Sequence, residues 1–294
     1  MRKIISEELS VSMEVQETCN NVIEEIVARL KDKQPTEIVG KDVSCAWFTL
    51  HCKMLSVNAN FNGENIIVDS KVYSFENEEM FDNLWQFCNF GGSYEISTQH
   101  IELSCYEIGG KFDKAFASSI LSHELEHALQ HIQSNNSIVG NSYNKAKMIV
   151  QGKDFYHASE LFNNIAQVIY FYHPREIDAN VNGAYNELLR ITEKNNIKGK
   201  KVLGLLPFAT AIREKATTDD CLSEIDVTKS IVELNYFGFS PRSFESYVAK
   251  YQAYFNRKLR KVVQKLINDT LVEAIIIPWK NKLLKERKRF LLDK

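Results

Sequence analysis

Twenty residues from Lys114 to Gln133 contain neither glycine nor proline, and they follow a region whose pattern is typical of β-strands. Gly109, Gly110 and Asp113 come just before this stretch, where a turn and an N-cap are expected. Within it the apolar residues recur at helical spacings: Phe116, Ile120, Leu121, Leu125, Ala128, Leu129 and Ile132. Such periodicity predicts one amphipathic helix. The chain is therefore expected to place a long helix directly after a sheet.

The predicted helix carries the sequence His-Glu-Leu-Glu-His at residues 123 to 127. Positions i and i+4 lie on one helix face, so His123 and His127 can direct two imidazoles at one metal ion. Zinc prefers such ligands, and a catalytic site leaves one position to water, whose pKa the metal lowers to about 7. Glu124 is then suited to take the proton of that water. The alternative is a solvated helix face that happens to display two histidines.

A catalytic zinc needs a third protein ligand. The continuation that would supply a third histidine is absent, because position 133 is Gln133. Further along, Pro174 is suited to begin a second helix that reaches about Ile191, with Glu176 in its first turn. Glu176 is the predicted third ligand, and Asp178, about 200° further around the helix, is the second choice. The other interpretation of Glu176 is an ordinary helix-start carboxylate that the helix dipole favours.

With these residues the chain resembles the gluzincin branch of the zincin metallopeptidases. In that branch a Glu on a later helix completes the His-Glu-x-x-His site, often in a Glu-x-x-Ala pattern that Glu176 and Ala179 match. The chain is also similar to compact metallopeptidase domains of some bacterial and phage regulators. The resemblance covers about residues 95 to 191. It implies a zincin-like α+β fold, a Zn²⁺ cofactor, and hydrolysis of peptide bonds in a protein or peptide substrate with Glu124 as general base.

Two positions depart from the family pattern. Glu126 is charged where most zinc peptidases carry an uncharged residue, and Asn180 stands where many gluzincins use Asp to hold the first histidine. Asn180 can still accept that hydrogen bond, although more weakly. Ala179 and Gly183 lie near the face of Glu176, and their small side chains predict a close approach of the two helices.

Gluzincin-like sites often use a Tyr or His to stabilise the oxyanion, and Tyr172 and His173 are the candidates here. The stretch Ile165 to Tyr172 is strongly apolar and aromatic, and tyrosines in such a stretch are more often core than catalytic. His157 lies in the same part of the chain.

His131 continues the i+4 row from His127. It can be an outer residue of the metal site, a competing ligand or a structural histidine. His51 and His100 lie in strand-like segments and are interpreted as structural.

The pattern predicts an α+β protein whose mostly antiparallel or mixed sheet precedes the metal-binding helix, with a largely helical C-terminal part. Three parts are predicted: an N-terminal helix in residues 1–35, a zincin-like core in 36–195, and a helical region with a basic tail in 196–294. A helical insert is expected over Glu78 to Phe87, and His100 to Tyr106 is the candidate edge strand for pairing with a peptide substrate. The expected strands are Cys45–Met54, Leu55–Phe61, Ile66–Phe75, Tyr94–Ser97 and His100–Ile108.

Residues 1–10 contain no apolar signal core, and no stretch approaches 18 consecutive apolar residues. A cytoplasmic location is therefore predicted. The six cysteines are scattered without Cys-x-x-Cys spacing, so free and mostly buried thiols are expected.

Charge is unevenly distributed along the chain. Residues 257–294 contain 12 Lys or Arg against 4 Asp or Glu, although the whole chain has a net charge of only −2. A basic helix can contact nucleic acid or an acidic partner, or it can be a solvated helix whose apolar side packs at Leu259, Val262, Val263 and Leu266. The second hypothesis for function is accordingly a non-catalytic regulatory or binding protein with a degenerate metal site. A carboxylate at Glu124, which a purely structural metal site does not need, favours the enzyme.

Overall fold

The computed structural model describes residues 12–41, 47–133, 141–152, 159–197 and 219–292. The chain is an α+β protein, as predicted, with a mixed sheet of six strands. Helix α1 (Met13–Leu30) precedes strands β1 (Thr36–Lys41), β2 (Trp47–Phe61) and β3 (Glu64–Phe75). A short helix α2 (Glu78–Leu84) and a 3-10 turn (Trp85–Phe87) then lead to β4 (Gly91–Glu95), β5 (His100–Ile108) and β6 (Lys111–Phe112).

The strand order is β1-β2-β3-β5-β4, and β6 also pairs with β5. Only β3 and β5 run parallel; the other described pairs are antiparallel. Strand β5 therefore has neighbours on both sides, and the prediction that His100–Tyr106 forms the edge is wrong. The edge strand on this side of the sheet is β4. The connection from β3 through α2 leads to this outer position, and β5 then lies between β3 and β4.

Strand β2 is a single strand of 15 residues rather than the two that the pattern predicted. The two halves of β2 bury opposite faces: Leu50 and Cys52 pack under α2, whereas Leu55, Val57 and Phe61 pack under α1 and α3. The alternation of buried and exposed residues changes phase between Cys52 and Leu55. In the sequence this change resembles a break between two strands, although the backbone pairing of β2 with β3 continues through it. Strand β1 was not predicted.

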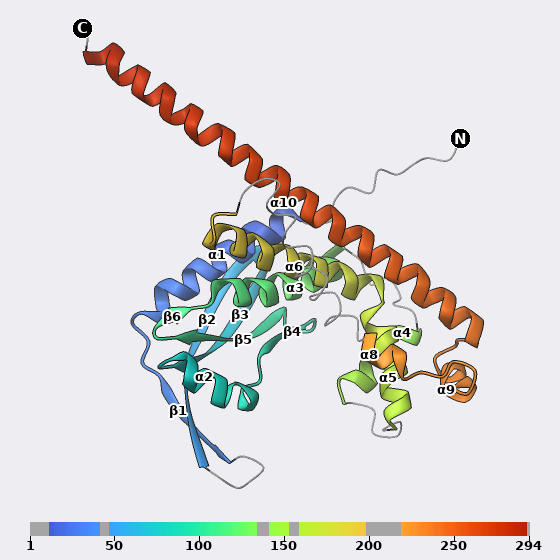
Figure 1. The fold of residues 1–294 in the computed structure, drawn as a ribbon. Helices are drawn as coiled ribbons and strands as arrows, with labels where there is room; N and C mark the ends of the chain where they lie inside the picture. Colours follow the sequence, from blue (N-terminus) through green and yellow to red (C-terminus); the bar gives the residue numbers. More distant parts are fainter. Residues whose placement is uncertain (1–11, 42–46, 134–140, 153–158, 198–218, 293–294) are drawn as a thin grey trace, which may run out of the picture.

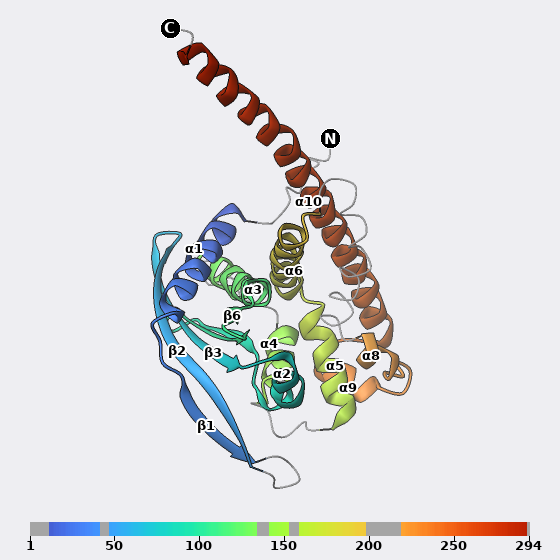
Figure 2. The same cartoon turned by 60° about the vertical axis from the view of Figure 1, so that its left-hand side comes forward.

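Helices follow the sheet: α3 (Lys114–Gln133), α4 (Asn141–Val150), α5 (Glu160–Phe171) and α6 (Pro174–Lys194), then α8 (Asp219–Ser223), α9 (Ile231–Tyr236) and α10 (Pro241–Leu292). Figure 1 shows α4, α5, α8 and α9 gathered beside the sheet, with the 52-residue α10 running past both parts. Figure 2 shows the succession of layers, from the sheet through α1 and α3 to α6 and α10.

Three hydrophobic clusters join the helices to one another and to the sheet. The first joins the sheet to α1 and α3, so the N-terminal helix belongs to the same core as the strands. The second joins α6 to α10, where Leu259, Val262, Val263 and Leu266 are buried as predicted. The third joins α4, α5 and α9 to the first turns of α10. The metal-motif helix is thus fixed by the sheet on one side and by α6 on the other.

Cys19, Cys52 and Cys105 are buried, and Cys88 and Cys221 are half-buried; all five are free thiols, as expected. Cys45 lies outside the described residues. In the described part of the chain, the helices are too short or too polar to cross a membrane.

Candidate metal centre

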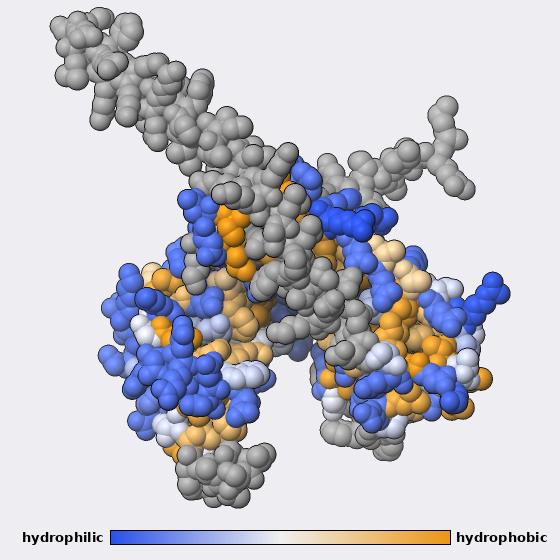
Figure 3. Space-filling view, viewed as in Figure 1, coloured by the Kyte–Doolittle hydropathy of each residue, from blue (hydrophilic) through white to orange (hydrophobic). Residues whose placement is uncertain are grey.

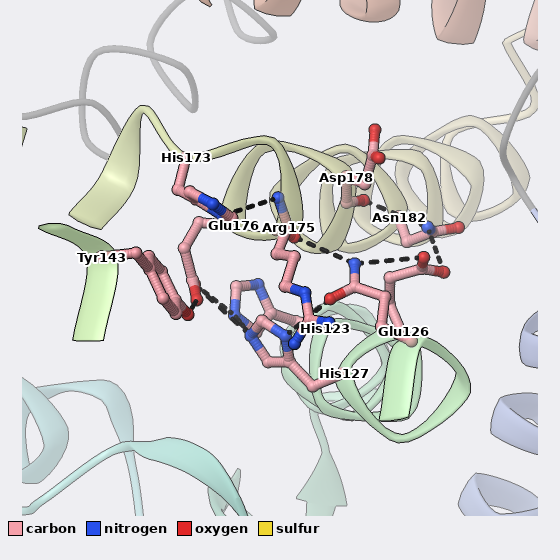
Figure 4. A network of polar contacts seen from close by, with 10 residues as sticks. His123, Glu126, His127, Tyr143, His173, Arg175, Glu176, Asp178 and Asn182 are labelled. Atoms are coloured by element: carbon pink, nitrogen blue, oxygen red, sulfur yellow. Dashed lines mark hydrogen bonds and ion pairs between the residues drawn. The ribbon is translucent and has the colours of Figure 1, made fainter. Parts of the chain in front are cut away.

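Two helices bring His123, His127 and Glu176 together. The two Nε2 atoms lie 3.1 Å apart, and Glu176 Oε2 lies 3.8 Å from His123 Nε2 and 3.4 Å from His127 Nε2. Figure 4 shows the two imidazoles from α3 and the carboxylate from α6 pointing at one another. Among the described residues these three form a group able to hold a metal ion.

The spacing of the three atoms fits tetrahedral zinc. Ligand atoms at about 2.0–2.1 Å from a tetrahedral ion are separated from each other by about 3.3 Å. The three observed separations of 3.1, 3.4 and 3.8 Å bracket this value. Two imidazoles and one carboxylate are also a donor set that catalytic zinc sites use, with a fourth position left to water.

The local sequence explains how the ends of the two helices that carry the ligands are fixed. Helix α3 is capped by Asp113, whose Oδ1 accepts a hydrogen bond from the Phe116 N–H over 3.0 Å. His173 caps α6, and Pro174 occupies the first turn, as predicted. Glu176 consequently lies in that first turn, one helical turn from the end of α5, and only 1 % of its surface is exposed.

The predicted close approach of the two helices is confirmed. A Cβ added at Gly183 would lie 2.9 Å from the backbone oxygen of Ser119, so any larger residue there would force α6 away from α3. Ala179 is fully buried. The small residues therefore set the separation at which the Glu176 carboxylate reaches the two histidines.

Burial and mutual charge set the protonation of the group. Burial lowers the pKa of His123 to about 4, with the neighbouring His127 adding to the effect. For Glu176 burial acts to raise the pKa, but His127, His123 and Tyr143 outweigh it and bring the pKa down to about 2. For His127 burial acts to lower the pKa, but the Glu176 carboxylate outweighs it and raises the pKa. The site therefore presents a neutral His123 and an ionised Glu176, which are the forms that bind a metal, whereas a metal must displace a proton from His127.

Glu124 lies beside the group and against the edge strand. It is buried, and burial raises the pKa of its carboxyl to about 7, although a hydrogen bond from the Tyr94 N–H of β4 acts in the other direction. A Cβ at Gly92 would lie 2.8 Å from Glu124 Cγ and 2.7 Å from Ile120, so this glycine lets the β4 backbone pack directly on α3. The edge of the sheet and the carboxylate are thereby held together.

A wall of aromatic rings lies on the other side of Glu176. Tyr143 of α4 donates a hydrogen bond to Glu176 Oε1, and its ring packs on His173 at 4.2 Å between centroids and on Tyr170 at 5.5 Å. The Tyr170 hydroxyl is in hydrogen-bonding range of both Glu176 and Tyr143. Because these ring contacts exclude water, burial raises the pKa of both tyrosines well above the usual range. Both hydroxyls are therefore held in the donor form.

The structure separates the other predicted residues into those near the centre and those away from it. His173 is near it, but its Nδ1 accepts a hydrogen bond from the Arg175 N–H as the cap of α6. Tyr172 is not near it: the side chain is 1 % exposed within the third cluster, and its hydroxyl accepts a hydrogen bond from Gln252 of α10. The prediction of Tyr172 as an oxyanion group is thus not supported, because residues 170 and 172 lie on opposite faces of the chain at the end of α5.

Asp178 faces away from the centre, as expected from its position on α6. Its Oδ1 lies 3.2 Å from Lys258 Nζ and accepts a hydrogen bond from the Tyr254 hydroxyl, both on α10. The side chain of Asn180 forms a hydrogen bond with His123, which is the contact that its position predicts.

The remaining histidines lie apart from the three ligand atoms. His131 Nδ1 is 3.2 Å from the Tyr94 hydroxyl and so joins α3 to β4. His100 lies 2.9 Å from Asp69 in the sheet, and His51 lies in β2. His157 is outside the described residues.

Comparison of the chain with protein families, with curated proteins and with solved structures finds no match. The geometry of the centre is therefore the basis for any statement about function.

Sequence reasoning missed three residues of the centre: Tyr143, Tyr170 and Gln130, whose Oε1 lies 3.4 Å from His127 Nδ1. Tyr143 follows a segment outside the described residues and carries no motif. Tyr170 was considered only as part of an apolar stretch. The one available signal was that Tyr170 lies six residues before Glu176. Pro174 predicts a helix end between them, and a spacing across a helix end does not determine where the side chain points.

Proposed function

We propose that this chain is a zinc-dependent metallopeptidase of the gluzincin type. His123, His127 and Glu176 would hold the ion, and the observation that carries the proposal is the convergence of their three ligand atoms at separations that suit tetrahedral zinc. When bound, zinc would lower the pKa of a coordinated water and polarise the carbonyl of the substrate.

Glu124 is suited to the role of general base. It is next to His123 in sequence, it is buried against β4, and it is not one of the three ligands. Its carboxylate takes the proton that the attacking water loses and returns it to the leaving amine as the C–N bond breaks. A metal site with a purely structural role has no use for this group.

The edge strand supports a peptide as the substrate. Among the described residues β4 pairs with β5 on one side and has no strand on the other. Figure 3 shows the molecule hollowed between the sheet and the helices α4 and α5, the elements that flank the metal ligands. An extended peptide can pair with the free side of β4 and so bring a backbone carbonyl to Glu124.

Tyr170 takes the place of Tyr172 and His173 as the group proposed to stabilise the oxyanion. Its hydroxyl is in hydrogen-bonding range of the ligand Glu176, and burial raises its pKa, which keeps the proton on the hydroxyl for donation. A donor held in place before the reaction stabilises the developing negative charge without reorganisation.

The test is to replace Glu124 by Gln and to measure zinc content and cleavage of a peptide library together. We expect Glu124→Gln to keep about one zinc per chain and to lose cleavage, because the amide cannot take the proton. Glu160→Gln is the matched control, since Glu160 is an exposed carboxylate in the first turn of α5. Unchanged cleavage by Glu124→Gln would contradict the proposed role of Glu124 as general base.

A further inference from the structure

Arg175 is a cation beside the metal centre, and its guanidinium forms no ion pair among the described residues. It lies in the first turn of α6, between Pro174 and the ligand Glu176, and it is half-buried. Its backbone is held on both sides: the N–H donates to His173 Nδ1 over 3.3 Å, and the carbonyl oxygen accepts from Gln130 Nε2 over 3.1 Å. The charge is therefore attached to the same helical turn as a metal ligand.

The side chain of Arg175 lies on the side of the centre. Figure 4 shows it running from α6 towards α3, the helix that carries the two ligand histidines. Burial lowers the pKa of His173 to about 4, and the Arg175 charge acts in the same direction. At Tyr143, which donates to Glu176, burial raises the pKa and the Arg175 charge opposes it. The guanidinium thus lies close enough to act on two rings that border the centre.

Four carboxylates lie near this turn, and each has other partners. Their contacts are Glu176 with His123, His127 and Tyr143, Asp178 with Lys258 and Tyr254, Glu126 with Gln130 and Asn182, and Glu124 with the Tyr94 N–H. An arginine stays charged in proteins, and a half-buried charge without a counter-ion is costly. Arg175 is therefore placed where a bound anion can pair with it.

A carboxylate is the anion that a peptide substrate supplies. The planar guanidinium presents a fork of N–H donors that matches the two oxygens of a carboxylate. Consecutive Cα atoms are about 3.8 Å apart, so the Arg175 side chain begins next to the ligand Glu176. A carboxylate that pairs with Arg175 consequently belongs to a substrate residue close to the scissile bond.

We propose that Arg175 is a specificity-determining residue that binds a carboxylate of the substrate. This inference rests on the proposed metallopeptidase function. The carboxylate has two sources: the C-terminus of the peptide, which makes the enzyme a carboxypeptidase, or the side chain of an Asp or Glu beside the scissile bond. In both cases a peptide without such a carboxylate is bound poorly.

The test compares two arginines that each follow a proline at the start of a helix. Arg175→Met removes the guanidinium and keeps an unbranched side chain, and Arg175→Lys keeps the charge without the two-pronged pairing. Arg242→Met is the matched control, since Arg242 follows Pro241 at the start of α10 and is exposed. Every full-length protein in the test also carries Glu124→Gln, so that peptides bind without being cleaved. Far-UV circular dichroism and the melting temperature establish that each is folded.

Binding is measured by equilibrium dialysis against three hexapeptide libraries, with mass spectrometry of the retained peptides. The first library has free C-terminal carboxylates and contains no Asp or Glu. The second is amidated at the C-terminus and carries one Glu in each peptide, and the third is amidated and contains no acidic residue. Each protein is measured as purified and again after metal removal with a chelator, because zinc itself attracts carboxylates.

We expect the Glu124→Gln protein and its Arg242→Met variant to retain the first or the second library about 10- to 100-fold more strongly than the third, with and without metal. Arg175→Met should lose this preference, and Arg175→Lys should keep part of it. Preference for the first library identifies a C-terminal carboxylate as the ligand, and preference for the second identifies an acidic side chain.

The proposal is overturned if folded Arg175→Met prefers carboxylate peptides as strongly as Arg242→Met, or if the Glu124→Gln protein itself shows no preference among the libraries. Failure of the proposed function gives a different result, because the chain then takes up no zinc in elemental analysis. In that case the metal-free protein still reports on Arg175: a preference that depends on this residue supports carboxylate binding, and one that does not depend on it contradicts the proposal.

Discussion

Gly183 offers the sharpest test of how helix packing forms the metal centre. In Gly183→Ala the new Cβ would lie 2.9 Å from the Ser119 backbone oxygen, whereas ordinary contacts at such atoms begin at 3.4 Å. Because the opposing atom is backbone, α6 must move away from α3 by about half an ångström. Overpacking of this size lowers the free energy of unfolding by about 1–3 kcal/mol, and the higher helix propensity of alanine raises it by about 1 kcal/mol. We expect a net loss of about 1 kcal/mol in the free energy of unfolding.

The same displacement moves Glu176 relative to the histidines. Metal–ligand distances tolerate only about 0.2 Å, so zinc affinity should fall about tenfold. The assays are urea unfolding of the metal-free protein and zinc competition with a chelator. Ala253→Gly at an exposed position of α10 measures the propensity difference alone. If Gly183→Ala is about 1 kcal/mol more stable than the wild type and binds zinc equally well, the close contact does not set the ligand spacing.

Two further predictions concern side chains around the ligands. Tyr170→Phe should retain zinc and lower kcat about 10²- to 10³-fold with little change in KM, because it removes a donor to the oxyanion; an unchanged kcat would exclude that role. Asn180→Asp should tighten zinc binding in chelator competition, because a carboxylate makes the His123 imidazole a more basic ligand. It also replaces a buried Nδ2 that has no hydrogen-bond partner among the described residues. Weaker binding would show that the buried charge costs more than it gains.

The parts of the centre that could be predicted are those that one helix encodes by itself. His123, Glu124 and His127 share a face because of their spacing, and the position of Glu176 follows from Pro174 and a capped helix start. Ala179 and Gly183 indicated the helix contact because small residues at helical spacing leave room for another backbone.

The parts that could not be predicted depend on the arrangement of distant segments. The alternation of residues in β5 is compatible with an edge strand and with an interior strand. Its place in the sheet is determined by the connection through α2, which puts β4 at the edge. The phase change inside β2 results from two different layers covering its two halves. Tyr170 and Tyr172 lie in the same apolar stretch, so the sequence does not distinguish them. In the structure the Tyr172 hydroxyl bonds to Gln252 of α10, and the Tyr170 hydroxyl is the one in range of Glu176.

The central claim is that three side chains form a zinc site, and metal content tests it most directly. Elemental analysis should compare the wild type, purified without added metal, with Glu176→Ala and with Glu160→Ala. Both glutamates lie in the first turn of a helix, so the control separates ligation from an effect of the helix dipole. The account predicts about one zinc per chain in the wild type and in Glu160→Ala, and reduced or absent zinc in Glu176→Ala. A wild type that contains no zinc and takes up none when it is supplied would contradict the account.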